Sequence, residues 1–219
     1  MSLLYYDSMY QVGDKLSRDY DHWQTDSKRI LLTSTKERSA LSIEHNRICM
    51  ETDVPLAAHV HENRFERAWK EYEAKIKVEK FFRMGFRMQS MIPVDFKFAE
   101  LAALTYGKLL STTSELSNII GKELQDYMFN VITKKEGYTL HLVCGPVKKG
   151  EISNWYNSAK LILDEEEKPP EIEYPEVAFL MDYDCYVQEP KSETAQTFYK
   201  EGAKVTRSAS QDLAQYLFS

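Results

Sequence analysis

The sequence lacks several features that would place it in a familiar class of protein chemistry. It contains no GxSxG, Walker or GxGxxG pattern, so the common hydrolase, NTPase and dinucleotide-binding signatures are absent. It also lacks a basic excess, because 28 Lys and Arg stand against 34 Asp and Glu, which gives a formal net charge of −6. Nucleic-acid binding needs basic side chains to neutralise phosphates, so we expect no nucleic-acid partner.

Long apolar runs and paired cysteines are missing too. No apolar stretch approaches the roughly 20 residues of a membrane span, and the beginning of the chain has neither the basic start nor the apolar segment of a secretory signal. The three cysteines, Cys49, Cys144 and Cys185, are widely spaced and lie in predicted strands. We therefore expect buried, reduced thiols in a cytoplasmic protein with no cofactor and no membrane partner.

The strongest pattern that is present predicts a hairpin over residues 126–147. Aromatic and branched side chains alternate with other residues along both arms, which is the period of half-buried strands. Between the arms, residues 134–137 are polar and end in a glycine that can adopt positive φ in a short loop. We expect this hairpin to lie at the centre of a sheet.

The remaining segments predict an α+β fold with one largely antiparallel sheet. We expect about six to eight strands, helices packed on one face and a long C-terminal helix, in a single domain over residues 1–219. Two halves, about 25–95 and 125–219, each place strands before a helix and leave a ββα pseudo-repeat open. Strands are predicted within 29–52 (three), 78–92 and 177–188, and helices at 63–77, 96–124 (two), 150–167 and 191–218, with 4–24 left unassigned.

The helix predicted at 63–77 begins with a capping-box spacing between Asn63 and Glu66. Its apolar stripe, which must pack on a sheet, consists of Phe65, Ala68, Trp69, Tyr72 and Ile76. Just before it, His59 and His61 form an H-x-H-E segment that could supply two metal ligands. No third His or Cys is near and HExxH is absent, so exposed loop histidines are the preferred interpretation.

Asp182 and Asp184 are the leading candidates for a catalytic role. They alternate along one predicted strand, so both carboxylates project from the same face. They could share a proton, bind a cation with further ligands, or pair with arginines. The alternative is a solvated or ion-paired sheet face without chemistry.

Arg83 and Arg87 are candidates for ligand binding. They project from one side of the strand predicted at 78–92 and flank Gly85, which leaves room above the sheet for a ligand or another backbone. Their guanidinium forks suit carboxylate or phosphate recognition. The preferred alternative is an ion-pair network with Asp182 and Asp184 on a neighbouring strand.

Three of these segments together resemble a sporadically distributed bacterial family of uncharacterised proteins. The stretch FFRMGFRMQ at residues 81–89 is similar to the family's Arg-x-Gly-x-Arg strand, and MDYDCY at 181–186 is similar to its Asp-x-Asp strand. A terminal helix follows, and the likeness covers roughly residues 58–218. The resemblance implies an α+β fold and adds no mechanism.

Three functions therefore stay open. The first is a non-enzymatic binding or assembly module, with an unknown protein or a small anionic ligand as its partner and a homodimer as an open possibility. The second is a metal-dependent or acid–base enzyme that uses Asp182 and Asp184 with Arg83 and Arg87. The third is a small-molecule carrier with a cavity between the sheet and the C-terminal helix.

Overall fold

A computed structural model describes residues 3–25, 29–34, 39–44, 48–52, 58–76, 81–110, 125–159 and 173–219. The chain divides into two compact units, which are described one at a time. The first unit takes in residues 1–80, 159–170 and 191–196, and the second takes in 81–158, 171–190 and 197–219. The single domain expected over residues 1–219, with its pseudo-repeat halves, stays a prediction.

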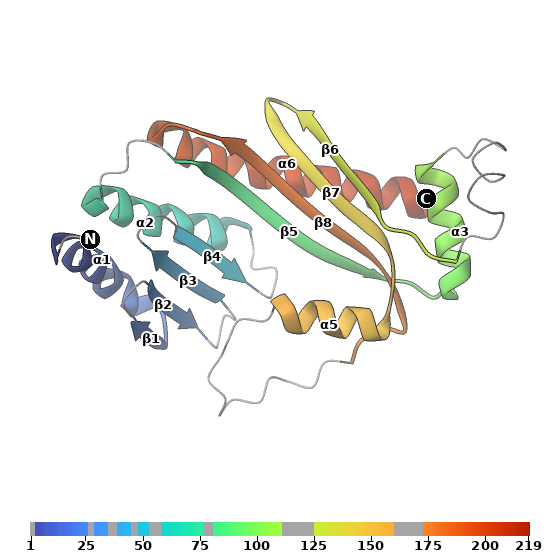
Figure 1. The fold of residues 1–219 in the computed structure, drawn as a ribbon, viewed down its shortest axis with the longest axis horizontal. Helices are drawn as coiled ribbons and strands as arrows, with labels where there is room; N and C mark the ends of the chain where they lie inside the picture. The colour runs from blue at the N-terminus through green and yellow to red at the C-terminus, as the bar shows by residue number, and fades with distance from the viewer. Residues whose placement is uncertain are drawn as a thin grey trace. The chain divides into compact units, whose positions relative to one another are not determined.

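The first unit contains a four-stranded antiparallel sheet whose strands follow one another in chain order (Figure 1). Ile30, Leu32, Leu41 and Ile43 alternate along its two middle strands and are all buried, so one face of the sheet is apolar. The three strands predicted within residues 29–52 are confirmed. The strands are β1 (His22–Thr25), β2 (Arg29–Ser34), β3 (Ser39–Glu44) and β4 (Ile48–Thr52).

Helix α1 (Leu3–Leu16) occupies the segment that the sequence left unassigned, and the short helix η1 (Ser17–Asp19) follows it. Met9, Val12 and Leu16 are buried at a spacing of i, i+3 and i+7, which is the signal that could have revealed this helix. The helix packs closely on the sheet, since a Cβ added at Gly13 would lie 3.1 Å from the Ile30 side chain.

Helix α2 (Ala58–Ile76) confirms the predicted stripe, because Ala68, Trp69 and Tyr72 are all buried. Its start differs from the prediction: the helix begins five residues before Asn63, so Asn63 lies inside it and does not cap it. A capping-box spacing is short and also occurs in helix interiors, so it did not locate the first turn. An ion pair connects α2 to α1, with Lys15 Nζ 2.7 Å from Glu71 Oε2.

The second unit contains another four-stranded antiparallel sheet, in the order β5-β8-β7-β6 (Figure 1). The predicted hairpin is confirmed as β6 and β7, but β6 is an outer strand, so the expectation that both hairpin strands are central was wrong. Strand β8 lies between β5 and β7 and pairs with both over most of its length. The strands are β5 (Arg83–Pro93), β6 (Phe129–Lys135), β7 (Tyr138–Lys148) and β8 (Val177–Gln188).

The hairpin closes through a two-residue loop. Lys135 and Tyr138 face each other at its base, and Glu136 and Gly137 between them have φ angles of 54° and 85°. Positive φ at both loop residues is the conformation of a type I′ turn, whose twist matches that of the two strands. The glycine predicted to close the loop therefore does so, in a loop shorter than residues 134–137.

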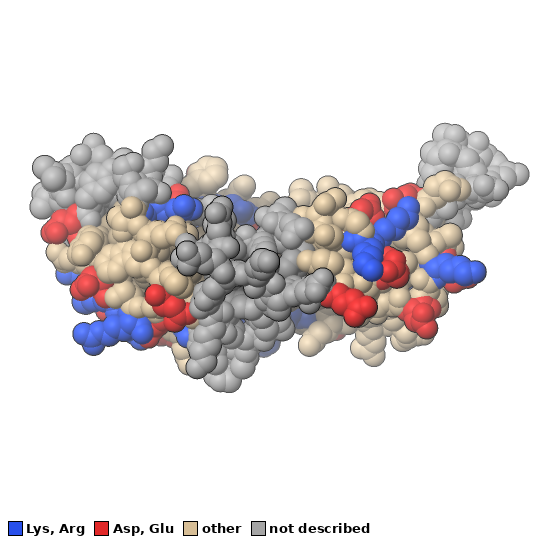
Figure 2. All heavy atoms as spheres, turned by 90° about the horizontal axis from the view of Figure 1, so that it is seen from below, with Lys and Arg blue, Asp and Glu red and all other residues tan. Residues whose placement is uncertain are grey.

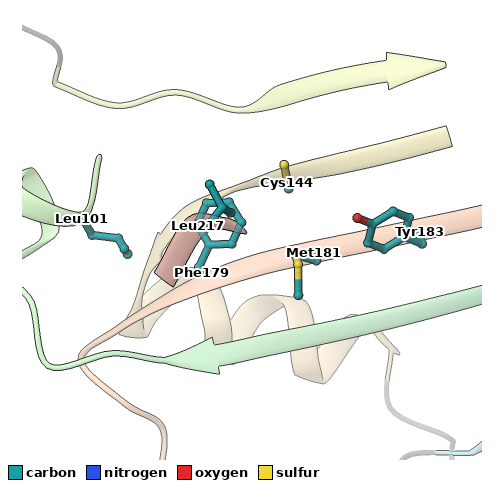
Figure 3. Close-up of a cluster of buried hydrophobic side chains, with 6 residues drawn as sticks. All are labelled: Leu101, Cys144, Phe179, Met181, Tyr183 and Leu217. Carbon is teal, nitrogen blue, oxygen red and sulfur yellow. The ribbon is translucent and has the colours of Figure 1, made fainter. Parts of the chain in front are cut away.

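The core of the second unit lies on the face of its sheet that α3 and α6 cover (Figure 3). Helix α6 (Ser192–Phe218) is the long C-terminal helix that the sequence predicted, and α3 is Phe98–Leu109. The buried cluster combines residues of both helices with residues of β7 and β8: Leu101, Cys144, Phe179, Met181, Tyr183 and Leu217. A smaller cluster on the opposite face joins Ile152 of helix α5 (Lys149–Ala159) to Ala178 and Leu180.

Strands in antiparallel sheets, together with these helices, confirm the predicted α+β class. Where one sheet was expected, the described residues form two sheets of four strands each, and α5 packs on the face of the second sheet opposite α3 and α6. Helix α3 has Lys97 at its N-cap position, and the backbone N–H of Lys97 donates to Glu100 Oε2 at 3.1 Å. The second helix predicted in 96–124 falls mostly on residues 111–124, outside the described residues. No helix in the described part of the chain is long and apolar enough to cross a membrane.

The buried stripe of α2 leads to a first prediction. Trp69 is 2% exposed and packs against Tyr72, with a ring-centroid distance of 6.0 Å. Replacing Trp69 by Ala should lower the free energy of unfolding by about 3–5 kcal/mol, because it removes buried apolar surface and leaves a cavity. Urea denaturation measures the change. Lys70→Ala on the exposed side of the same helix is the matched control and should cost below about 0.5 kcal/mol. An equal loss in both variants would show that the stripe is not buried.

A second prediction concerns two glycines of the second unit. A Cβ at Gly145 in β7 would lie 2.6 Å from the backbone carbonyl oxygen of Tyr127, whereas a Cβ at Gly107 in α3 would meet nothing within 4 Å. Gly145→Ala should therefore destabilise the protein by about 1–3 kcal/mol through overpacking. Gly107→Ala should instead stabilise it by about 0.5–1 kcal/mol, because alanine loses less backbone entropy in a helix. Thermal unfolding of the two variants would contradict this account if both shifted in the same direction.

Candidate functional site

The face of the second sheet opposite the main core is rich in polar side chains. The alternation of side chains assigns each strand residue to one of the two faces, and the register aligns the residues in rows across the four strands. We call this surface, without the end that α5 covers, the open face. It consists of Arg83, Gly85, Arg87 and Gln89 of β5, Asp182, Asp184, Tyr186 and Gln188 of β8, Thr139, His141 and Val143 of β7, and Asn130, Ile132 and Lys134 of β6.

Two ion pairs join β5 to β8 on the open face. Arg87 binds Asp182 with both arms of its fork, since Nε donates to Oδ1 at 2.9 Å and Nη2 donates to Oδ2 at 2.5 Å. Arg83 donates from Nη2 to Asp184 Oδ2. The hypothesis that these four residues share a face and form a charge network is thus confirmed. A two-point contact of this kind fixes the plane of the guanidinium group as well as its position.

Arg83, the arginine nearest the end of the sheet, is held by two interactions. Asp184 faces Arg87 in the strand register, so Arg83 reaches it from four residues away, along the side of Gly85. The Arg83 guanidinium carbon also lies 4.3 Å from the ring centroid of Tyr186, which is the residue facing Gly85. The room predicted beside Gly85 is therefore taken up by Asp184, whose Oδ1 lies 3.4 Å from where a Cβ would stand.

The acids lie deep and the bases lie at the surface. The side chains of Asp182 and Asp184 are 8% and 22% exposed, whereas those of Arg87 and Arg83 are 59% and 41% exposed. The hydrogen bond with Asp182 raises the pKa of Arg87, and the negative charges of Asp182 and Asp184 add to the effect against an opposing loss of hydration. The network consequently presents positively charged groups outward from a carboxylate base.

A polar pair that the sequence did not reveal lies on the neighbouring strands. His141 Nε2 is 2.8 Å from Asn130 Oδ1 across the hairpin, and His141 faces Asp184 on its other side. The sequence alone does not show a partner for His141, because the pairing of the two strands depends on the length of the loop between them. With a two-residue loop at 136–137, the register would have placed Asn130 diagonally across from His141.

The other candidates of the sequence contribute less. His59 and His61 lie within α2, not in a loop before it, and their possible metal binding stays a prediction. Among the residues the structure describes, no group of three or more His, Cys, Asp and Glu side chains is placed to hold a metal ion. None of the three cysteines forms a disulfide: Cys144 and Cys185 are buried as predicted, but Cys49 is only half-buried. Burial raises the pKa of the Cys144 thiol to about 12, which disfavours the reactive thiolate.

Two surface grooves share no lining residue with the open face. One, of about 330 Å³ in the first unit, is polar and is lined by Asp14, Lys15, Ser17, Arg18, Arg67 and Glu71. The other, of about 500 Å³ in the second unit, is mostly apolar and lies between the end of β5, α3 and the end of α6. Neither groove is lined by Asp182, Asp184, Arg83 or Arg87.

Comparison with known proteins adds no further constraint. No protein-family model, no curated protein and no solved structure shows significant similarity to the chain. The bacterial family resemblance and the cytoplasmic location therefore stay predictions.

On the surface seen in Figure 2, basic and acidic side chains are interspersed and do not form one basic area, in keeping with the net charge of −6.

The unequal burial of the ion pairs leads to a third prediction. Arg87→Ala should lower the free energy of unfolding by about 2–3 kcal/mol, because it leaves the nearly buried Asp182 carboxylate without its partner. Asp182→Ala should cost less, because the guanidinium left behind is already exposed to water. A double-mutant cycle should give a coupling of about 1.5–3 kcal/mol for this pair.

The pair whose carboxylate is more exposed, Arg83 with Asp184, is the matched control. The same cycle on these two residues should give a coupling below about 1 kcal/mol, because the Asp184 carboxylate has more contact with water than that of Asp182. Chemical denaturation of the two sets of variants measures both couplings. Zero coupling between Arg87 and Asp182 would contradict the network.

Proposed function

We propose that this protein is a binding module whose open face recognises an anionic partner through Arg83 and Arg87. The observation that carries the proposal is the layering of charge. Each guanidinium group is anchored by a carboxylate that lies deeper in the sheet, yet its side chain stays 41% or 59% exposed. An anchored arginine loses little further side-chain entropy when a ligand binds, which favours binding.

The unused donors of the two arginines set the chemistry of the ligand. An arginine has five N–H groups, and Asp182 takes up only part of those of Arg87. The two anchoring residues are two strand steps, or about 7 Å, apart along β8. Two guanidinium groups held at such a spacing suit an oxyanion, a phosphate or a carboxylate, that accepts hydrogen bonds from both.

The same observations support the enzyme and the carrier less. Asp182 and Asp184 are both engaged by guanidinium groups, which compete with a metal ion or a substrate proton for the carboxylate oxygens. The space between the sheet and α6 is filled by side chains such as Met181, Tyr183 and Leu217, where the carrier would need a cavity. The binding module uses the arginines as they are placed.

A fourth prediction tests the proposal by NMR titration of the ¹⁵N-labelled protein. Inorganic phosphate is the first probe and a hexaglutamate peptide is the second, so that phosphate and carboxylate recognition are measured separately. At least one probe should shift the amide signals of β5 and β8 with a dissociation constant of about 1 mM or tighter. Added salt should weaken binding, because the contact is between charges at the surface.

Two variants that each remove one positive charge test whether binding depends on Arg83, and the control lies on the other side of the unit. Arg83→Gln should weaken binding at least about fivefold, which corresponds to the loss of roughly 1 kcal/mol of hydrogen bonding. Lys204→Gln on the exposed side of α6 should leave binding unchanged. The proposal fails if neither probe shifts the β5 and β8 signals at probe concentrations up to about ten times that dissociation constant. It also fails if both variants bind equally well.

A further inference from the structure

The two guanidinium groups of the proposed anion site extend from β5 toward β8. Arg87 binds Asp182 and Arg83 binds Asp184, and both acids belong to β8. The next strand beyond β8 is β7. Neighbouring strands lie about 4.8 Å apart, so a side chain of β7 on the open face is close enough to contact an anion held by the two arginines.

His141 is the residue of β7 at this place. It faces Asp184 in the strand register, and Arg87 faces Asp184 from the other side, so the three residues form one row across the sheet. The Cβ atoms of facing residues lie about 4.5–5.5 Å apart. His141 is therefore the β7 residue nearest to Asp184, the carboxylate that anchors Arg83.

A contact with β6 determines which nitrogen of His141 can gain a proton. Nε2 lies 2.8 Å from Asn130 Oδ1, and an amide oxygen only accepts hydrogen bonds, so Nε2 carries a hydrogen. In the neutral ring Nδ1 then has a lone pair, which repels an anion. In the charged ring Nδ1 carries a second N–H, which can donate to an anion.

We propose that His141 is a third contact of the anion site and that its protonation strengthens binding as the pH falls. This inference rests on the proposed function of the open face. Histidine side chains change charge between about pH 5 and 8. Above this range the anion is held by the two guanidinium groups, and below it the anion gains a charged N–H group from the next strand.

The charged and titratable groups that face His141 come from both neighbouring strands. Asp184 faces it on β8, and Asp182 and Tyr186 lie two residues away on either side along that strand. On β6, Lys134 shares the open face and lies two residues from the one that faces His141. The carboxylates favour the charged ring, whereas Lys134 and the arginines oppose it. A bound anion therefore shifts the balance toward protonation.

NMR titration with sulfate tests the role of His141, because sulfate keeps its charge over this pH range whereas phosphate does not. In the wild-type protein, the dissociation constant measured on the β5 and β8 amide signals should be at least about fivefold lower at pH ~5.5 than at pH ~8. His141→Gln stays neutral and can still donate to Asn130, so it should lose this pH dependence. His22→Gln in β1 of the first unit is the matched control and should keep it.

The histidine ring signals give a second measurement that needs no variant. A fivefold preference of sulfate for the charged ring requires, by linkage, that saturating sulfate moves the titration of His141 about 0.7 pH units higher. The titration of His22 should stay in place when chloride balances the ionic strength. Absence of sulfate binding at both pH values would contradict the anion site itself. Equal binding at both pH values, or a pH dependence that His141→Gln retains, would overturn the role of His141 and leave the anion site intact.

Discussion

The second unit depends on the pairing of β8 with strands on both of its sides. The twelve residues of Val177–Gln188 pair with β5 along one edge and with β7 along the other. Because side chains alternate, this one strand gives Phe179, Met181 and Tyr183 to the core and Asp182 and Asp184 to the opposite face. A shift of register by one residue would put both carboxylates into the apolar layer, so the core and the charged face fix each other.

The charge layering follows from this position of β8 between two neighbours. Strands inside a sheet are more shielded from water than outer strands, so the acids of β8 lie deeper than the arginines of the outer strand β5. A shielded carboxylate needs a partner, and the long arginine side chain supplies one while its charged group keeps contact with water. The outward positive groups are therefore a consequence of which strand carries the acids and which the bases.

Much of this arrangement could be predicted from periodicity, and the parts that failed needed information of another kind. Period two identified β8 and the hairpin, and it placed Arg83 with Arg87 and Asp182 with Asp184 on one side of their strands, because alternation is a local property of the chain. It did not reveal that β6 is an outer strand, because strand order is set by contacts between distant segments. It also did not assign the individual ion pairs, since Arg87 faces Asp184 in the register yet binds Asp182.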